Sequence, residues 1–296
     1  ASSSDFSPDA LRELVERAVA MARAAPEDPF CGLAEADDLA RDLPDLDLAD
    51  TDDANVESLK ARARAAEDAA RAVQGVTNSE GAQASFSRSA VALVASNGFA
   101  GLRGETHHGV AASVLAGNGA AMERDYDYAS AIHAADLASP EAVGRSAGER
   151  AVRRLNARKM QTAKMPVVFE PRVAGSLLRH LASAVNGQSV ARGTTFLKDQ
   201  MGARIFSEAV TIVDDPLRRR GLNSHPFDGE GLAPRALKLV DRGALKSWVL
   251  DLRSARQLKL RSTGHAARGI SAPPAPATSN LYLEPGKVSP AALLAG

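Results

Sequence analysis

Cysteine is almost absent from this sequence, because Cys31 is the only one in 296 residues. A single thiol excludes an internal disulfide and a four-cysteine metal site, and it is typical of proteins that fold in a reducing compartment. We expect Cys31 itself to be a small residue that is buried or half-buried. Aromatic residues are also scarce, at 4% of the chain, so alanine, valine and leucine must form most of the core.

Long apolar runs and an excess of one charge are missing as well. No stretch reaches the roughly 18 to 20 apolar residues that cross a bilayer, and no secretory leader is recognisable. With the lone cysteine, this pattern predicts a cytoplasmic protein without a membrane partner. The 36 basic residues balance 36 acidic ones, so the chain has no general attraction for nucleic acid.

Charge is segregated locally instead. Residues 35 to 57 are strongly acidic and residues 145 to 164 are basic, and both patterns are typical of solvated faces or loops. A nucleic-acid adaptor would have to use the second segment and residues 218 to 220, but stacking aromatics and a helix-turn-helix spacing are missing. A phosphate-binding glycine loop is absent too. Nucleic acid is therefore not an expected partner.

Capping signals and apolar periodicity predict helices in the N-terminal half. Ser7-Pro8 precedes a helix over residues 8 to 25, residues 56 to 73 form a second one, and Ser139-Pro140 begins a third. Between the first two, residues 28 to 53 are expected to wrap the surface as a loop. Its predicted apolar anchors are Leu43, Leu46 and Leu48.

The apolar period changes to that of strands after Ala84. Asn97-Gly98 predicts a tight hairpin turn. The expected meander has strands at residues 86 to 94, 99 to 106, 110 to 115 and 122 to 133, the last with Tyr126 and Tyr128 on one face. His107 and His108 point to opposite faces of a strand, so we expect exposed polar residues rather than two ligands of one metal.

The stretch from Met165 to Asn186 predicts a strand, a turn and a helix. The β-branched run of residues 166 to 169 is typical of a buried strand, and residues 173 to 185 repeat as an amphipathic helix. Further on, Asp241-Arg242-Gly243 predicts a second hairpin, with Trp248 as a core anchor. The remaining expectations are strands at 210 to 213 and 280 to 283, a helix at 254 to 260, and an extended loop at 271 to 278.

These elements predict the α+β class, with N-terminal helices and an antiparallel β-meander followed by a C-terminal mixed-sheet domain around the strand-turn-helix unit. We place the two domains at residues 1–160 and 161–296. The chain begins without methionine, and the family resemblance given below implies that it is a fragment lacking both ends of a longer protein.

Several motifs occur in the order found in one known family. They are Met122-Glu123-Arg124-Asp125-Tyr126, Leu177-Leu178, Arg192-Gly193-Thr194-Thr195-Phe196, Thr211-Ile212-Val213-Asp214-Asp215, Pro226-Phe227-Asp228-Gly229-Glu230-Gly231 and Thr263-Gly264-His265-Ala266. Together they resemble the PmbA/TldE branch of the TldD/PmbA proteins, a peptidase family once described as modulators of DNA gyrase.

The resemblance implies a helix with a zinc motif, but this chain departs from it. The TldD branch carries His-Glu-x-x-x-His directly after the Leu-Leu pair. Here those three positions hold Arg179, His180 and Ala184. A guanidinium, one imidazole and a methyl group do not make a zinc site. We therefore expect no cofactor in this chain and zinc in a TldD-like partner.

The resemblance implies a non-catalytic subunit of a heterodimeric zinc metallopeptidase that acts on unfolded or short peptides, including peptide-antibiotic precursors. Asp228, Glu230 and His265 are the residues expected to contact substrate or the partner subunit. Self-association is expected in isolation. Two other readings stay open: an independent metal-free hydrolase using Asp228, Glu230 or His265, and an adaptor for DNA gyrase or nucleic acid.

Overall fold

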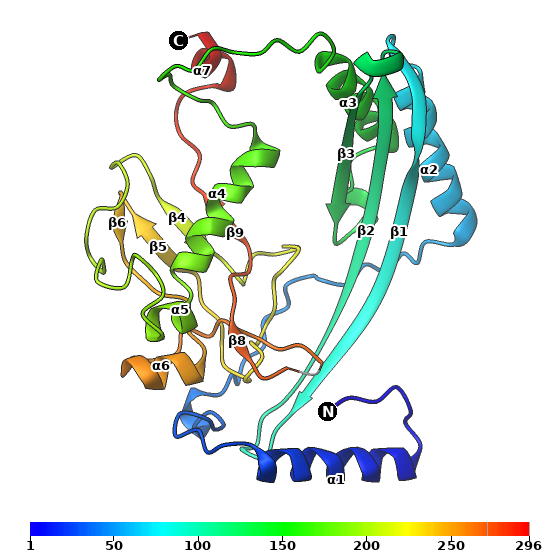
Figure 1. Ribbon diagram of the computed structural model, residues 1–296. Coiled ribbons are helices and arrows are strands. Elements are labelled where there is room, and N and C mark those ends of the chain that lie inside the picture. Colours follow the sequence, from blue (N-terminus) through cyan, green and yellow to red (C-terminus); the bar gives the residue numbers. More distant parts are fainter. Residues whose placement is uncertain (271, 296) are drawn as a thin grey trace.

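The computed structural model describes residues 1–270 and 272–295, and it confirms the α+β class. Figure 1 shows a long twisted sheet with two helices on one side of the molecule and a C-terminal part of short strands and helices beside it. Residues 28–53, here called the acidic strap, run between these two parts. Within the described residues, no helix is long and apolar enough to cross a membrane.

The long sheet is an antiparallel hairpin with a third strand added. β1 (Val76–Val94), β2 (Ala100–Ala116) and β3 (Glu123–Ala131) lie in the order β1-β2-β3. The predicted turn at Asn97-Gly98 is confirmed, and Gly98 has a φ of +94°, a value that suits glycine. The two strands expected at 99 to 106 and 110 to 115 are wrong. They form one strand, because His107, His108 and Gly109 continue the pairing with β1.

Two helices cover one face of this sheet. α2 (Val56–Arg71) and α3 (Pro140–Arg153) pack on the even-numbered residues of β2, and their core is built from alanine and valine. Ser139 caps α3 as predicted, because its hydroxyl accepts a hydrogen bond from the Ala142 amide at 3.2 Å. The two helices approach closely at Gly144, where an added Cβ would lie 1.9 Å from the carbonyl oxygen of Ala66.

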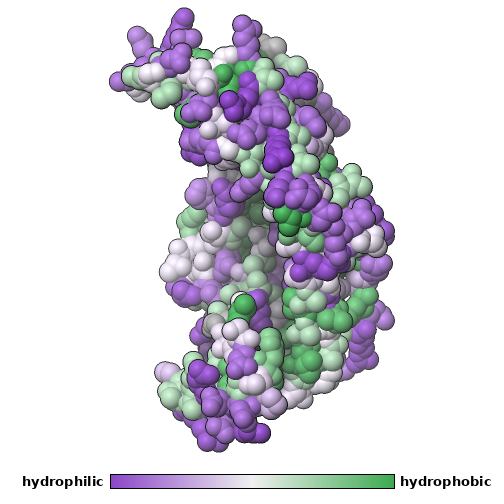
Figure 2. All heavy atoms as spheres, turned by 90° about the vertical axis from the view of Figure 1, so that its right-hand side faces the viewer, coloured by the Kyte–Doolittle hydropathy of each residue, from purple (hydrophilic) through white to green (hydrophobic). Residues whose placement is uncertain are grey.

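The far end of the hairpin extends beyond these helices. Its outer surface carries apolar side chains, with Val94 75% exposed and Leu102 69% exposed. Figure 2 shows this side of the molecule, where hydrophobic side chains gather in the lower half. α1 (Pro8–Ala24) lies across the same end, begins at the Ser7 cap as predicted, and buries none of its residues. The short helical turns are η1 (Ala36–Asp38), η2 (Gly119–Ala121) and η3 (Ala134–Asp136).

The acidic strap is held at both parts of the molecule. Leu46 and Leu48 are buried as predicted, but Leu43 is exposed, so it is not an anchor. The Leu46 carbonyl accepts a hydrogen bond from the Arg220 amide at 2.9 Å, and the Leu48 carbonyl accepts one from the Thr106 amide at 2.9 Å. The strap thereby connects β2 to the C-terminal part.

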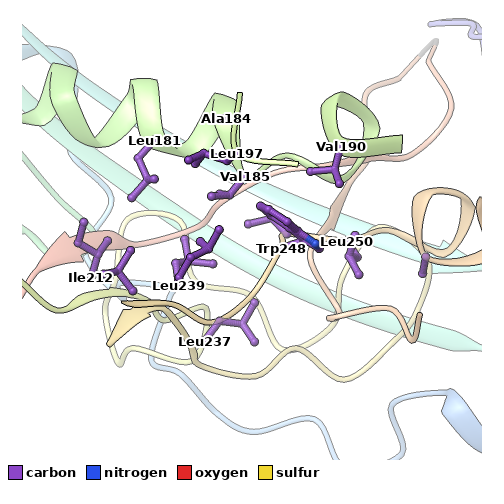
Figure 3. Close-up of a cluster of buried hydrophobic side chains, with 14 residues drawn as sticks. Leu181, Ala184, Val185, Val190, Leu197, Ile212, Leu237, Leu239, Trp248 and Leu250 are labelled. Carbon is purple, nitrogen blue, oxygen red and sulfur yellow. The ribbon is translucent and has the colours of Figure 1, made fainter. Parts of the chain in front are cut away.

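The C-terminal part has its own apolar core, shown in Figure 3. A four-stranded sheet has the order β6-β5-β4-β9, and a second small sheet pairs β7 with β8. The strands are β4 (Ile212–Asp214), β5 (Leu237–Asp241), β6 (Ala244–Leu245), β7 (Ala266–Ala267), β8 (Ala275–Pro276) and β9 (Leu281–Leu283). The helices are α4 (Pro171–Ala184), α5 (Gly187–Ala191), α6 (Leu252–Leu258) and α7 (Pro290–Ala295).

The predicted hairpin at residues 241 to 243 and the burial of Trp248 are confirmed. α4 and α6 agree with the expected helices, and Ser271 of the expected loop lies outside the described residues. The buried strand at Pro166 to Phe169 is wrong. That run is irregular and exposed, with Val167 66% exposed, because no neighbouring strand supplies hydrogen bonds. The ladders between the C-terminal strands are antiparallel, and one isolated parallel bridge joins Asn186 to Val249.

Candidate functional site

The main candidate site is a cavity of about 550 Å³ between the long hairpin and the loops of the C-terminal part. β1 and β2 supply Val91, Arg103, Glu105 and His107, and the opposite wall is formed by residues 222–225, 227–229, 265–270 and 277–279. We call this cavity the hairpin cleft. It contains two of the three residues that the sequence singled out for substrate contact, Asp228 and His265.

His265 is fully buried between two acceptors. Its Nε2 lies 3.1 Å from a carboxylate oxygen of Asp214, and its Nδ1 lies 2.8 Å from the carbonyl oxygen of Thr263. Asp214 also accepts hydrogen bonds from the amide and the hydroxyl of Ser279. The Nδ1 contact holds the ring in the cleft wall, whereas the buried Nε2, although close to Asp214, has no hydrogen-bond partner in the described residues. Sequence reasoning missed Asp214, whose partners are distant in sequence.

Asp228 is buried by a loop that folds around its carboxylate. The oxygens accept hydrogen bonds from the amides of Glu230 and Leu232 at 2.9 Å and of Ala266 at 3.1 Å. Burial raises the pKa of Asp228, while these hydrogen bonds act in the opposite direction. The carboxylate is therefore held inside the folded loop rather than presented to solvent. Its carboxylate fixes residues 228 to 232 against β7.

Glu230 belongs to a different environment and does not line the cleft. Its carboxylate accepts a hydrogen bond from the Leu252 amide, at the start of α6, at 2.8 Å. Burial, with the nearby charges of Asp228 and Asp251, raises the pKa of Glu230 to about 7. Beside it, Leu39 of the acidic strap packs against a small apolar cluster that includes Leu232 and Leu252. Glu230 therefore lies where the strap meets the C-terminal part.

His225 is the other imidazole of the cleft wall. Its Nδ1 lies 3.0 Å from the Asn223 carbonyl oxygen, and its buried Nε2 has no hydrogen-bond partner in the described part of the chain. Burial lowers the pKa of His225, so its neutral form is favoured near pH 7. The structure places His225 and His265 in one cleft, but the carboxylate next to His265 is Asp214 and not Asp228.

The three positions of the zinc motif lie on α4, outside the cleft lining. Arg179 and His180 are exposed, whereas Ala184 is buried in the core beneath the helix. This donor set does not fit a zinc ion, because a methyl group has no lone pair and a guanidinium is a fixed cation. Elsewhere in the described residues, no three His, Cys, Asp or Glu side chains are grouped to hold a metal ion.

A second polar network fixes the acidic strap. Asp47 accepts hydrogen bonds from Arg219 at 2.9 Å and Arg220 at 2.6 Å, and one of its oxygens lies 3.2 Å from Nε2 of His133. His108 is 1% exposed, contrary to its predicted exposure, because the strap covers it with Asp50 at 3.3 Å. Burial lowers the pKa of His108. His107 is half-buried on the opposite face.

The remaining expectations concern Cys31 and the basic segments. Cys31 is exposed rather than buried. In the basic segment, Arg150 pairs with Asp127 and Glu170, and Arg154 lies 3.2 Å from Glu123. These partners neutralise two of the arginines that a nucleic-acid surface would need.

Two family models match the sequence. The PmbA/TldA metallopeptidase central domain matches residues 49–155, and the PmbA/TldA metallopeptidase C-terminal domain matches residues 162–296. The Metalloprotease PmbA of Escherichia coli O157:H7 is 39% identical over 269 residues, which is 90% of this chain and 59% of that protein. A Metalloprotease PmbA homologue of Haemophilus influenzae is 35% identical over the same shares.

Solved structures have a similar fold. A protein of Bacteroides thetaiotaomicron described as a modulator of DNA gyrase has a TM-score of 0.89 and 24% identity, covering 99% of this chain and 65% of that one. TldE of Thermococcus kodakarensis has a TM-score of 0.76 and 22% identity, covering 97% and 65%. The chain thus spans less than two thirds of the length of each of these proteins.

Proposed function

The chain belongs to the PmbA/TldD metallopeptidase family, in its PmbA branch, and we propose that it is a non-catalytic subunit of a heterodimeric zinc peptidase. Zinc would lie in a TldD-like partner. The observation that carries this proposal is the side-chain set of α4, where Arg179, His180 and Ala184 stand at the motif positions. The substrates proposed for the assembled enzyme are unfolded or short peptides, including peptide-antibiotic precursors.

The chemistry of zinc supports the proposal. A catalytic zinc site usually has three protein ligands and one open position for water. α4 offers one imidazole, and Arg179 next to it would repel a dication. Ala184 is packed in the core of the C-terminal part, so its position faces apolar side chains rather than a site.

The cleft residues do not favour an independent hydrolase. Three backbone amides donate to the carboxylate of Asp228, and the Thr263 carbonyl holds Nδ1 of His265. Glu230 lies outside the cleft, so the two carboxylates of the loop do not face one bound substrate. General acid and base catalysis needs groups within hydrogen-bond reach of a reacting atom. The cleft is better suited to binding than to bond cleavage.

Co-purification with a TldD-like subunit from the same source, followed by peptide cleavage, tests the proposal. We expect a stable complex that cleaves an unstructured peptide in a chelator-sensitive reaction, and no cleavage by this chain alone. The TldD-like subunit alone is the matched control, and adding this chain should raise its activity. Cleavage by this chain alone would contradict the proposal, as would a TldD-like subunit that neither binds it nor responds to it.

A further inference from the structure

We propose that the hairpin cleft binds the carboxylate terminus of an extended peptide, with Arg103 and Arg268 as the groups that hold the anion. Arg103 comes from β2, and Arg268 follows β7 on the opposite wall. This inference rests on the proposed function, because it specifies which part of a peptide the subunit would hold. It assigns a ligand to a cavity that does not include the zinc-motif positions of α4.

Among the described residues, two guanidiniums of the cleft lack a close carboxylate partner. Arg268 donates from Nε to the Gly229 carbonyl at 2.9 Å, and no carboxylate in the described chain pairs with its guanidinium. Arg103 has only a loose carboxylate partner, since its Nη1 lies 3.8 Å from Glu105. Two guanidiniums with Nη donors to spare are well suited to a carboxylate, which they can bind in a bidentate manner.

The carboxylates of the cleft walls are already occupied. Asp228 accepts three backbone amides, and Asp214 accepts from Ser279 while facing His265. Glu105 accepts from the Ser89 hydroxyl at 3.2 Å as well as facing Arg103. Because none of them makes a close ion pair with Arg103 or Arg268, the positive charge of the two guanidiniums is available to a ligand.

The sheet next to the cleft offers a path for the rest of a peptide. The odd-numbered residues of β2 from Arg103 to Ser113 share one face with the odd-numbered residues of β1, and the β1 side chains of this face include exposed Gln83, Ser85, Ser87 and Ser89. At about 3.4 Å per residue, the path from Arg103 to Ser113 is roughly 34 Å long. Small polar side chains leave room for an extended backbone.

This path ends at an exposed aromatic pair. A second hollow of about 440 Å³ is lined by Gln83, Ala111, Ser113 and Tyr126. The Tyr126 and Tyr128 rings stack at a centroid distance of 6.3 Å, and the two side chains are 44% and 56% exposed. Exposed tyrosines provide contact area at low entropic cost. A peptide anchored by its carboxylate in the cleft can therefore lay upstream side chains on these rings.

The experiment compares two forms of one peptide. A ten-residue, serine-rich peptide with one central phenylalanine carries a fluorophore on its N-terminus and ends in either a free acid or an amide. Fluorescence anisotropy with the chain should show at least tenfold tighter binding of the acid. Arg268→Gln should reduce affinity for the acid about tenfold and leave the amide unchanged. Arg192→Gln, at an exposed site beyond α5, is the control and should change neither.

The outcomes separate this inference from the proposed function. Equal binding of acid and amide would overturn carboxylate recognition and leave the peptide-handling subunit in place. Binding of neither form would overturn the inference and remove support for peptide handling by this chain. Inorganic phosphate that displaces the acid at concentrations equal to the peptide would also overturn it, since the cleft would then be a general anion site. Arg103→Gln provides a second variant should Arg268→Gln fail to fold.

Discussion

Replacing Glu230 by glutamine should make the protein more stable at alkaline pH. Glutamine has nearly the shape of the protonated side chain, and its carbonyl oxygen can still accept the hydrogen bond from the Leu252 amide. The pKa of Glu230 is raised from 4.5 to about 7. At about 1.4 kcal/mol per pKa unit, this shift corresponds to roughly 3 kcal/mol.

The sign follows from proton binding. Between pH 4.5 and 7 the native state keeps a proton on Glu230 that the unfolded chain releases, so Glu230 lowers the free energy of unfolding as pH rises through this window. Below pH 4.5 both states are protonated and the penalty vanishes. The Glu230→Gln variant lacks the penalty, so its advantage over the parent should grow from near zero at pH 4.5 to about 3 kcal/mol at pH 8.

Urea unfolding of both proteins at pH 4.5 and pH 8 measures this difference. Glu13→Gln, on the exposed surface of α1, is the control and should change the free energy of unfolding by less than about 0.5 kcal/mol at either pH. A gap between Glu230→Gln and its parent that does not change with pH would refute the reasoning. A variant that is less stable than the parent at pH 8 would refute it as well.

Two further predictions concern helix packing and the acidic strap. Gly144→Ala should lower the free energy of unfolding by roughly 3 kcal/mol or more, because the added Cβ would lie 1.9 Å from the carbonyl oxygen of Ala66. Gly175→Ala in α4 has no atom within 4 Å of the added Cβ and should raise the free energy of unfolding by about 0.5 to 1 kcal/mol. Thermal unfolding of both variants measures the difference, and equal shifts of the two midpoints would contradict the prediction. Asp47→Asn keeps a residue type that tolerates the φ of +54° but removes the negative charge that faces Arg220 and His133. The acidic strap should then be held less firmly, so trypsin should cleave it at Arg41 faster than in the parent protein. An unchanged cleavage rate would contradict the electrostatic attachment of the strap.

Local signals predicted the elements that local chemistry determines. Ser7-Pro8 and Ser139-Pro140 begin helices because a hydroxyl cap and a proline at the first position act within one turn. Asn97-Gly98 makes its turn through the positive φ of glycine. These preferences need no distant partner, so the sequence displays them directly.

The sequence-based predictions were wrong where contacts with residues distant in the sequence determine the structure. The run from Pro166 to Phe169 has the composition of a strand but no neighbour to pair with, so it stays irregular. His108 is buried because the acidic strap, more than fifty residues earlier, folds over it. No local pattern contains that contact.

The candidate site was predicted in part. The sequence singled out Asp228 and His265, and both line the cleft, but it did not indicate that they lie near each other. The backbone amides around Asp228 and the proximity of His265 to Asp214 depend on long-range folding. Arg103 and Arg268 lacked any motif. Only the folded structure places these two arginines in the lining of one cavity.

The most direct test of the central claim is the zinc content of each subunit, purified separately and after reconstitution, together with peptide cleavage by a complex carrying His180→Ala. The account predicts no stoichiometric zinc in this chain, about one zinc per TldD-like subunit, and nearly unchanged cleavage with His180→Ala. Replacing the first motif histidine of the TldD-like subunit is the matched control and should abolish cleavage. Stoichiometric zinc in this chain, or loss of chelator-sensitive cleavage with His180→Ala, would contradict the account.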